Sequence, residues 1–455
     1  SCQDNLDSDA GVSNTRSVNI DKDLFAIKGC INVKLAKGTN QSIPTTRSGS
    51  VEMQSVPSAM TSAMQYSGAY KMERVFKPAG IYEARTVAEG LDRWYTIYFD
   101  KSKDVAAVLD QFKKAEGVEC AERVLPMARP TVKMTPYSAP EASMQGTGSN
   151  FDDPLLAKQW HYYNNGTINP RAVKGADCNV KPVWEKYTTG KKNVIVAVVD
   201  GGIDITHEHL KDNLYVNEKE KNGQPNVDDD GNGFVDDIYG YNFVTAKDVV
   251  GGTIEPDDGG HGTHVAGTVA ARNNNGKGVA GIAGGDGSPD SGVRLLSCQI
   301  FRNKDEQGDA AAAIKYAADN GAVICQNSWG YSSTAGVTSM PQLLKEAVDY
   351  FIKMAGCDAN GNQRPDSPMK GGVVMFAAGN ENKEFSAYPA CYAPTVSVAA
   401  MAWDFSKASY SNYAKWVTIT APGGDQDRFG TEAGVLSTVP TVSYTHLRAH
   451  ETSLH

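Results

Sequence analysis

From residue 151 onward, short apolar runs alternate with segments of helical periodicity, and this alternation constrains the fold more than any other feature. The runs are VIVAVV at 194–199, VRLLSCQI at 293–300, AVICQ at 322–326, GVVMFAA at 372–378 and TVSVAA at 395–400. A strand that is apolar at every position has both faces covered, as in parallel sheets. Alanine-rich or amphipathic segments at 309–320 and 341–354 lie between the runs. The sequence therefore predicts an α/β fold with a doubly wound, mostly parallel sheet.

A smaller α/β unit precedes this sheet. Residues 94–99 (WYTIYF) and 118–124 (VECAERV) indicate strands, and 104–116 carries apolar residues at helical spacing. The low-complexity stretch 37–65 is expected to be a flexible loop. We divide the chain into the following parts: an N-terminal tether (1–30), a small α/β domain (31–125), an exposed linker (126–150), a large α/β domain (151–442) and a tail (443–455).

The composition argues against several classes of function. The net charge of −9 over 455 residues, without a basic run, argues against a nucleic-acid partner. No stretch approaches the roughly 20 apolar residues that a membrane helix needs. None of the eight cysteines belongs to a CxxC pair, so a zinc site is not expected.

Cys2 stands at the start of a polar, acidic segment, QDNLDSD. This arrangement resembles the mature start of a bacterial lipoprotein, in which a lipid on the cysteine anchors an exported protein to a membrane. The alternative is a chance cysteine in a frayed terminus. The lipoprotein hypothesis predicts a secreted or cell-surface protein.

Three polar residues stand at or near the starts and ends of these predicted elements. Asp200 follows the run at 194–199, His261 begins the small-residue helix HGTHVAGTVAA, and Asn380 follows the run at 372–378. A buried carboxylate can orient an imidazole, histidine is a general base near neutral pH, and an amide can stabilise an oxyanion. Taken singly, Asp200 and Asn380 are also typical turn formers. The sequence argues against a metal site at His261 and His264, because no HExxH pattern is present, and His264 is expected to make structural hydrogen bonds.

Four motifs occur in a fixed order: VVDGGID (198–204), HGTHVAG (261–267), NSWG (327–330) and AAGN (377–380). In this order they resemble the subtilase family of serine peptidases. The resemblance implies that Asp200 orients His261, that His261 is the general base, and that Asn380 completes the oxyanion hole. It also implies a substrate cleft with a pocket for the substrate residue that precedes the cleaved peptide bond. Near this pocket the cleft would be lined by Ser328, Trp329 and Gly330. Trp329 replaces a common leucine, which is expected to alter that pocket.

The resemblance further implies that the small domain at 31–125 is an inhibitory propeptide. Such a segment assists folding and blocks the cleft until it is cut. The implied protein is a secreted serine endopeptidase, made as a zymogen, that acts on protein or peptide substrates.

The nucleophile motif of the family, GTSMAxP, is not found after Asn380. The residues after 435–440 read TVSYTHLRAHETSLH, without period or turn signals. We hypothesise that 443–455 is a non-native tail, and that the chain as printed has no peptidase activity because no acyl-enzyme can form. GVTSMP at 336–341 lies at the wrong place in the family order, so Ser339 is predicted to cap the following helix.

Two other functions compete with the peptidase hypothesis. A non-catalytic, subtilase-like peptide-binding protein would keep the cleft and lack the serine. An enzyme acting on small molecules is disfavoured because no GxGxxG turn follows the first strand of the large domain.

An acidic loop, NVDDDGNGFVDD at 226–237, is a candidate cation site. Its oxygen-bearing side chains alternate around a Gly turn as in the first half of an EF-hand loop, and they are Asp228, Asp230, Asn232, Asp236 and Asp237. The sequence therefore predicts a structural calcium ion, with a solvated acidic turn as the alternative.

Overall fold

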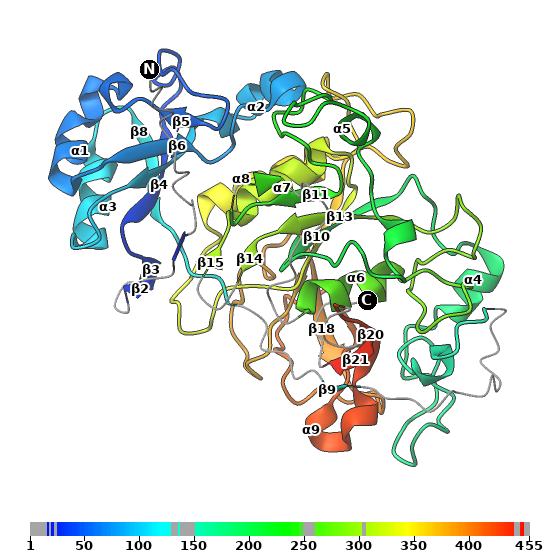
Figure 1. The fold of residues 1–455 in the computed structure, drawn as a ribbon. Coiled ribbons are helices and arrows are strands. Elements are labelled where there is room, and N and C mark those ends of the chain that lie inside the picture. Colours follow the sequence, from blue (N-terminus) through cyan, green and yellow to red (C-terminus); the bar gives the residue numbers. More distant parts are fainter. Residues whose placement is uncertain are drawn as a thin grey trace, which may run out of the picture.

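The computed structural model describes residues 25–128, 151–245, 260–302 and 306–440, together with the backbone of short strands at 16–17, 20–21, 135–136, 247–248 and 446–449. Two domains are visible in Figure 1, a smaller N-terminal domain (blue to cyan) and a larger domain (green to red). Among the described residues, no helix has both the length and the apolar character needed to cross a bilayer.

The N-terminal domain is built on a five-stranded antiparallel sheet in the order β5-β6-β7-β4-β8. Its strands are β4 (Cys30–Leu35), β5 (Ser50–Val51), β6 (Lys71–Arg74), β7 (Trp94–Tyr98) and β8 (Val118–Arg123). Its helices are α1 (Thr61–Ser67), α2 (Glu83–Ala88) and α3 (Val105–Lys114), with 3-10 turns η1 (Met53–Ser55), η2 (Ser58–Met60), η3 (Gly80–Tyr82) and η4 (Leu91–Arg93).

The strand–helix–strand unit predicted in this domain is confirmed. Asp104 caps α3 by accepting hydrogen bonds from the backbone N–H groups of Ala106 and Ala107. The flexible loop predicted at 37–65 is wrong, because Met60 and Met64 are buried in the domain core. Their spacing of four places both on one face of a short helix, a signal that the low complexity of the stretch concealed.

The larger domain contains an eight-stranded sheet in the order β12-β11-β13-β10-β16-β17-β18-β19. Its strands are β10 (Ile195–Asp200), β11 (Gly240–Asn242), β12 (Lys247–Asp248), β13 (Arg294–Gln299), β16 (Ile324–Asn327), β17 (Val373–Ala377), β18 (Val396–Met401) and β19 (Ile419–Pro422). All neighbours pair in parallel except β11 and β12, and the predicted doubly wound α/β sheet is thus confirmed.

Helices cover both faces of this sheet, as the continuous apolar runs require. Ala197 and Val199 of β10 pack in the core shared with α7 (Ala310–Asp319) and α8 (Gln342–Met354). Val196 and Val198 point the other way, into the core beside α6 (His261–Ala270). Successive strand residues face opposite sides, so one strand contributes to two cores.

The remaining elements are short. They are α4 (Lys181–Lys186), α5 (Glu218–Lys221), α9 (Gln426–Phe429), η5 (Leu156–Lys158), η6 (Lys211–Asn213), η7 (Thr431–Ala433), β1 (Arg16–Ser17), β2 (Ile20–Asp21), β3 (Ala26–Ile27), β9 (Thr135–Pro136), β14 (Phe301–Arg302), β15 (Glu306–Gln307), β20 (Val435–Thr438) and β21 (His446–Ala449).

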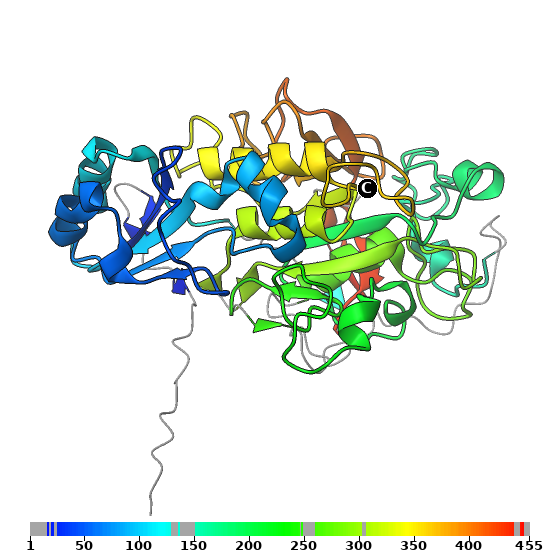
Figure 2. The same ribbon diagram turned by 90° about the horizontal axis from the view of Figure 1, so that it is seen from above.

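The N-terminal domain packs against α7 and α8 of the larger domain, and Figure 2 shows it reaching alongside α8 (yellow). Glu346 on α8 accepts hydrogen bonds from Lys34 Nζ at 2.7 Å and Trp94 Nε1 at 2.8 Å. At the start of α8, Glu122 accepts from the backbone N–H groups of Gln342 and Leu343 at 2.8 and 3.1 Å.

The predicted capping of this helix by Ser339 is therefore wrong. The residue at the cap position is Pro341, which offers no side-chain cap. The open N–H groups are satisfied instead by Glu122, a residue of the other domain.

Not every predicted boundary falls on described residues. Ala26 and Ile27 are already buried, so folded structure begins a few residues before the expected end of the tether at 30. Cys2 and most of the linker lie outside the described residues. The predicted tail 443–455 also lies outside them except for the backbone of β21, which pairs with β20 and β9.

Candidate active site

Asp200 and His261 form a buried hydrogen-bonded pair. Nδ1 of His261 lies 2.8 Å from Oδ1 of Asp200, and the two residues are 3 % and 2 % exposed. A carboxylate can only accept, so Nδ1 carries the proton and donates it to this bond. Oδ1 of Asp200 also accepts from the backbone N–H of Gly201 at 2.7 Å, which fixes the orientation of the carboxylate. The arrangement leaves the lone pair of the neutral imidazole on Nε2.

Close backbone packing brings the pair together. Asp200 is the last residue of β10, and His261 is the first residue of α6. A Cβ on Gly262 would lie only 2.3 Å from the backbone oxygen of Gly202, so only glycine lets α6 begin directly against the turn after β10. Further along α6, Nε2 of His264 lies 3.2 Å from the carbonyl oxygen of Val435, which confirms its predicted structural role.

Asn380 lies three residues beyond β17, two strands away from β10 in the sheet. Because β10, β16 and β17 are parallel, their carboxyl ends share one edge. Oδ1 of Asn380 is buried and has no hydrogen-bond partner within the described residues.

Ser328, Trp329 and Gly330 follow β16 and line the same pocket as Asn380, with a volume of about 210 Å³. Trp329 is 3 % exposed and stacks edge-on against Phe376, with ring centroids 5.3 Å apart. The indole is therefore also part of the core beneath the pocket.

A segment from the end of the N-terminal domain enters this pocket. The backbone N–H of Ala128 donates to the carbonyl oxygen of Gly330 at 2.8 Å in an antiparallel bridge. Gln307 holds the same segment from the other side, because its amide accepts from the N–H of Met127 and donates to the carbonyl of Leu125. These contacts are the ones by which an extended peptide adds to a strand edge.

Sequence reasoning did not find Ala128 or Gln307. Met127 and Ala128 fell in the predicted linker, and neither motif nor composition marked them. The NSWG motif at 327–330 did suggest an extended backbone edge for a peptide, but only the structure identifies Ala128 as the residue that pairs with Gly330.

The acidic loop brings together three carboxylates, those of Glu220, Asp228 and Asp230, whose ligand atoms lie within 4.8 Å of one another. Two of the predicted ligands are therefore in the cluster. Glu220 lies on the preceding helix α5 and was not predicted from the sequence, because the charged pattern EKEK is typical of a solvent-exposed helix.

The other three predicted ligands make different contacts. Asn232 donates to Asp237 and to Asn320, and Asp237 also accepts from the Tyr316 hydroxyl at 2.7 Å. Asp236 accepts from the backbone N–H of Asn226. Asn232 and Asp237 thus join the loop to the C-terminal end of α7, and Asp236 stabilises the loop itself.

The donor set of the cluster suits a hard cation. All three ligands are carboxylates, and Glu220 is only 3 % exposed. Burial raises the pKa of Asp230, and the neighbouring Asp228 raises it further. Burial likewise raises the pKa of Glu220, against the effect of the backbone N–H groups of Asp230 and Asp236. A divalent cation would relieve this concentration of negative charge.

Known proteins resemble both domains. The model of the subtilase family matches residues 191–454, and the model of the N-terminal region of that family matches residues 31–166. The first of these matches includes most of the predicted tail.

Among curated relatives, subtilisin-like protease 1 of Plasmodium falciparum is 33 % identical over 175 residues, which is 38 % of this chain and 24 % of the relative. Fervidolysin of Fervidobacterium pennivorans is 28 % identical over 333 residues, which is 69 % of this chain and 36 % of the relative. The chain thus spans about a quarter to a third of the length of these relatives.

Among solved structures, that of fervidolysin from Fervidobacterium pennivorans superposes with a TM-score of 0.55 at 20 % identity, covering 94 % of this chain and 53 % of that one. At this identity the superposition supports the shared fold. Because a single family model accounts for residues 191–454, more than half of the sequence, the chain belongs to the subtilase family of serine peptidases.

Proposed function

We propose that this protein is a serine endopeptidase, made as an inactive precursor, that hydrolyses peptide bonds in protein or peptide substrates. The hydrogen bond of 2.8 Å between Asp200 and His261 carries the proposal. It places a buried carboxylate behind the imidazole and sets the tautomer that a general base needs.

The proposed mechanism assigns one task to each residue. Nε2 of His261 takes the proton of a serine hydroxyl as the hydroxyl attacks the substrate carbonyl, and Asp200 stabilises the resulting imidazolium. The Nδ2 group of Asn380 donates to the developing oxyanion. The backbone edge at Gly330 holds the substrate as an added strand, in the way that it holds Ala128. His261 then returns the proton to the leaving amine, which departs and leaves the acyl group on the serine. In the second half of the reaction His261 takes a proton from a water molecule, the water attacks the acyl group, and the proton passes to the serine oxygen as the acid product leaves.

The serine itself is proposed to come from a GTSMAxP-type motif. The printed sequence has no such motif after Asn380, so we propose that the chain as printed is inactive and that 443–455 is non-native. An independent reading of the gene tests this directly. The motif beyond residue 440 is expected, whereas the same tail followed by a stop codon would favour the peptide-binding alternative.

The N-terminal domain is proposed to act as the inhibitory propeptide. The contacts of Ala128 with Gly330 and of Gln307 with Leu125 and Met127 support this role, because they fill the edge on which a substrate would bind.

Peptidase activity is tested with a form of the protein that carries the serine motif. After removal of the N-terminal domain, this form is expected to cleave a casein substrate and to react with a fluorophosphonate probe. The His261→Ala variant should lose both reactions, since its serine has no base, while an Asn360→Ala variant in an exposed turn should keep them. Equal labelling of the His261→Ala variant and the parent would overturn the proposal.

We also propose that Glu220, Asp228 and Asp230 hold a structural calcium ion, for which the cluster of three carboxylates is the support. When bound, the ion would supply positive charge that ties α5 to the acidic loop.

Export, with membrane anchoring through a lipid on Cys2, is a further proposal. Metabolic labelling with an alkyne fatty acid tests it: the parent chain with its native leader should be labelled and the Cys2→Ser variant should not.

A further inference from the structure

An insertion in the N-terminal domain makes a second contact with the larger domain, on surfaces outside the active-site pocket. β6 ends at Arg74 and β7 begins at Trp94, although about two to five residues suffice to connect the strands of a hairpin. The additional residues form η3, α2 and η4. Figures 1 and 2 show α2 extending from its own domain over the larger one.

Arg85 of α2 is buried in the larger domain, with 5 % of its surface exposed. Nε donates to the hydroxyl of Tyr350 at 2.7 Å, and Nη2 donates to Oδ1 of Asp319 at 2.7 Å. Nη1 donates to the carbonyl oxygens of Cys357 and Asp358 at 3.1 and 2.8 Å. All four acceptors belong to the larger domain and match the planar fork of a guanidinium, which an ammonium cannot do.

Aromatic rings complete the pocket around the guanidinium. Cζ of Arg85 lies 5.5 Å from the ring centre of Tyr350 and 4.4 Å from that of Tyr82. Tyr350 belongs to α8 and Tyr82 to the insertion, so the cation lies near a ring from each domain.

Asp319 keeps a cationic partner when Arg85 is withdrawn. Nζ of Lys315 lies 2.5 Å from Oδ2 of Asp319, and the Tyr350 hydroxyl donates to Oδ1 of Asp319 at 2.7 Å. Asp319 therefore keeps a cation and a hydrogen-bond donor of its own domain. A buried carboxylate with no partner would oppose departure of Arg85, but this one has partners in both states. Reversible binding of the guanidinium is thus physically reasonable.

Small molecules have access to the contact. A cavity of about 460 Å³ is lined on one side by Ile81 and Tyr82 of the insertion and on the other by Asp319 and Arg364 of the larger domain. A guanidinium compound in solution can approach Asp319 through this space once Arg85 is absent.

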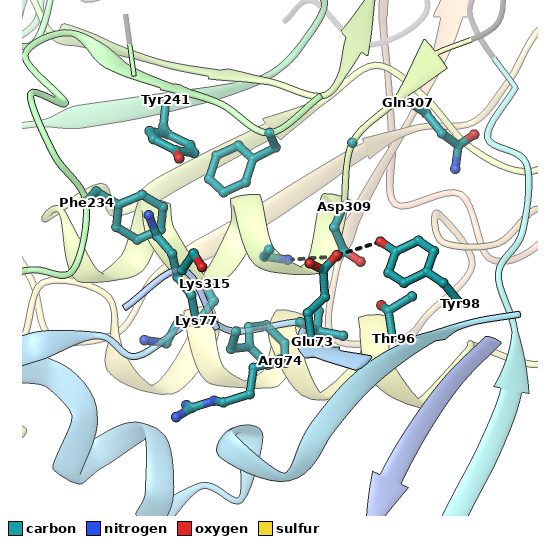
Figure 3. A pocket seen from close by; sticks show the side chains of 16 residues that line it. Glu73, Arg74, Lys77, Thr96, Tyr98, Phe234, Tyr241, Gln307, Asp309 and Lys315 are labelled. Atoms are coloured by element: carbon teal, nitrogen blue, oxygen red, sulfur yellow. Dashed lines mark hydrogen bonds between the residues drawn. The ribbon is translucent and has the colours of Figure 1, made fainter. Parts of the chain in front are cut away.

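Lys77, at the start of the same insertion, makes a second cationic contact. Its Nζ lies 3.5 Å from the ring centre of Phe234 and 4.7 Å from that of Tyr241. The three side chains are labelled in Figure 3. These rings border a cavity of about 120 Å³ between the two domains. The insertion thus places two cationic side chains, Arg85 and Lys77, against parts of the larger domain that are separate from the backbone edge at Gly330.

We propose that the pocket formed by Asp319, Tyr350 and the carbonyls of Cys357 and Asp358 is a guanidinium-binding exosite, filled by Arg85, that retains the N-terminal domain after the linker is cut. The retention of an inhibitory domain by this exosite rests on the proposed zymogen function. Binding of Arg85 in the pocket does not rest on it, because the association of the two domains can be measured without peptidase activity.

The test uses the full chain with a recognition sequence for a site-specific protease inserted at 129–150. After the cut, dissociation of the N-terminal domain is followed by energy transfer between fluorophores on the two domains. Arg85→Ala is expected to dissociate about 30-fold faster or more, because the four hydrogen bonds from Arg85 to the larger domain are lost. Arg47→Ala, which removes an exposed arginine of the same domain, should match the parent.

Chemical rescue distinguishes a guanidinium pocket from a general loss of packing. Ethylguanidinium at millimolar concentration should slow dissociation of the Arg85→Ala variant, and ethylammonium should not. Tyr350→Phe, which leaves the N-terminal domain unaltered, should accelerate dissociation by about tenfold through loss of one charge-assisted hydrogen bond. Parental rates for both variants, or equal effects of the two small cations, would overturn the proposal. Because none of these readouts involves peptide hydrolysis, they are unaffected if the protein proves to have no peptidase activity.

Discussion

At the scale of single residues, the orientation of two side chains decides what the site can do. His261 uses Nδ1 to contact Asp200, which leaves the lone pair of the neutral ring on Nε2. Asn380 holds a buried amide oxygen that lacks a partner in the described part of the chain. Both residues could be named from sequence motifs, but the hydrogen-bonding state of each could not, because it depends on which backbone groups the fold brings near.

Replacement of Asn380 tests its role in the transition state. In a form that carries the serine motif, Asn380→Ala is expected to lower kcat by about 10²–10³-fold with little change in KM, since the oxyanion forms only in the transition state. Steady-state kinetics on a peptide anilide measure both constants, and Asn360→Ala is the matched control. A change confined to KM would instead assign Asn380 to ground-state binding.

At the scale of elements, helix α8 depends on another domain for its cap. Its first N–H groups are satisfied by Glu122, and Pro341 at the cap position contributes no side-chain bond. Burial, together with the negative charges of Glu346 and Asp309, raises the pKa of Glu122 to about 7 despite these N–H donors. The carboxyl group is thus protonated more readily when the domains are docked than when Glu122 faces water.

This difference in pKa predicts pH-dependent docking. Because the docked-state pKa is the higher one, docking should be tightest below about pH 4.5 and weaken as the pH rises to about 7, by about tenfold for each pKa unit. Dissociation rates of the cut chain, measured between pH 4 and pH 8, check this. Glu122→Gln should flatten the profile, whereas Glu116→Gln, an exposed change in the same domain, should not. An unchanged profile in Glu122→Gln would show that another group controls docking.

The acidic loop supports a prediction on metal removal. Addition of calcium to chelator-treated protein should raise Tm by about 5 °C, because an ion present at 100 times its Kd adds about 2.7 kcal/mol to folding stability. Glu220→Gln should reduce this shift, since it removes one of the three clustered carboxylates. Glu218→Gln, which alters an exposed carboxylate two residues away, is the control. Identical shifts in both variants would remove Glu220 from the site.

At the scale of the whole molecule, the sheet and its strand-end residues were predictable, and the contacts between domains were not. The apolar run at 194–199 anticipated β10, because burial of both faces leaves a clear sequence pattern. Arg85 and Glu122 look in the sequence like ordinary charged surface residues. Their partners lie 234 and 220 residues away at Asp319 and Gln342, so only the tertiary structure reveals their roles.

A buried histidine makes global stability depend on acidity. His209 is 1 % exposed, and burial, assisted by the nearby His207, lowers its pKa to about 4. Below about pH 6.5 the unfolded chain binds a proton at this position more readily than the folded one does. The free energy of unfolding should therefore fall between pH 6.5 and pH 4, by about 3 kcal/mol from this residue. Urea denaturation across this range measures the loss, which His209→Gln should reduce, and equal losses in both proteins would refute this assignment.

The antiparallel bridge between Ala128 and Gly330 has a kinetic consequence. The segment at Ala128 belongs to the same polypeptide as the cleft that it occupies. Its effective concentration at the cleft is therefore set by chain geometry and not by the amount of protein in solution. Opening of the bridge between Ala128 and Gly330 should accordingly be a first-order event, with a half-time that dilution leaves unchanged. Under the proposed function, a substrate peptide would compete on equal terms only after the covalent connection to Ala128 has been cut.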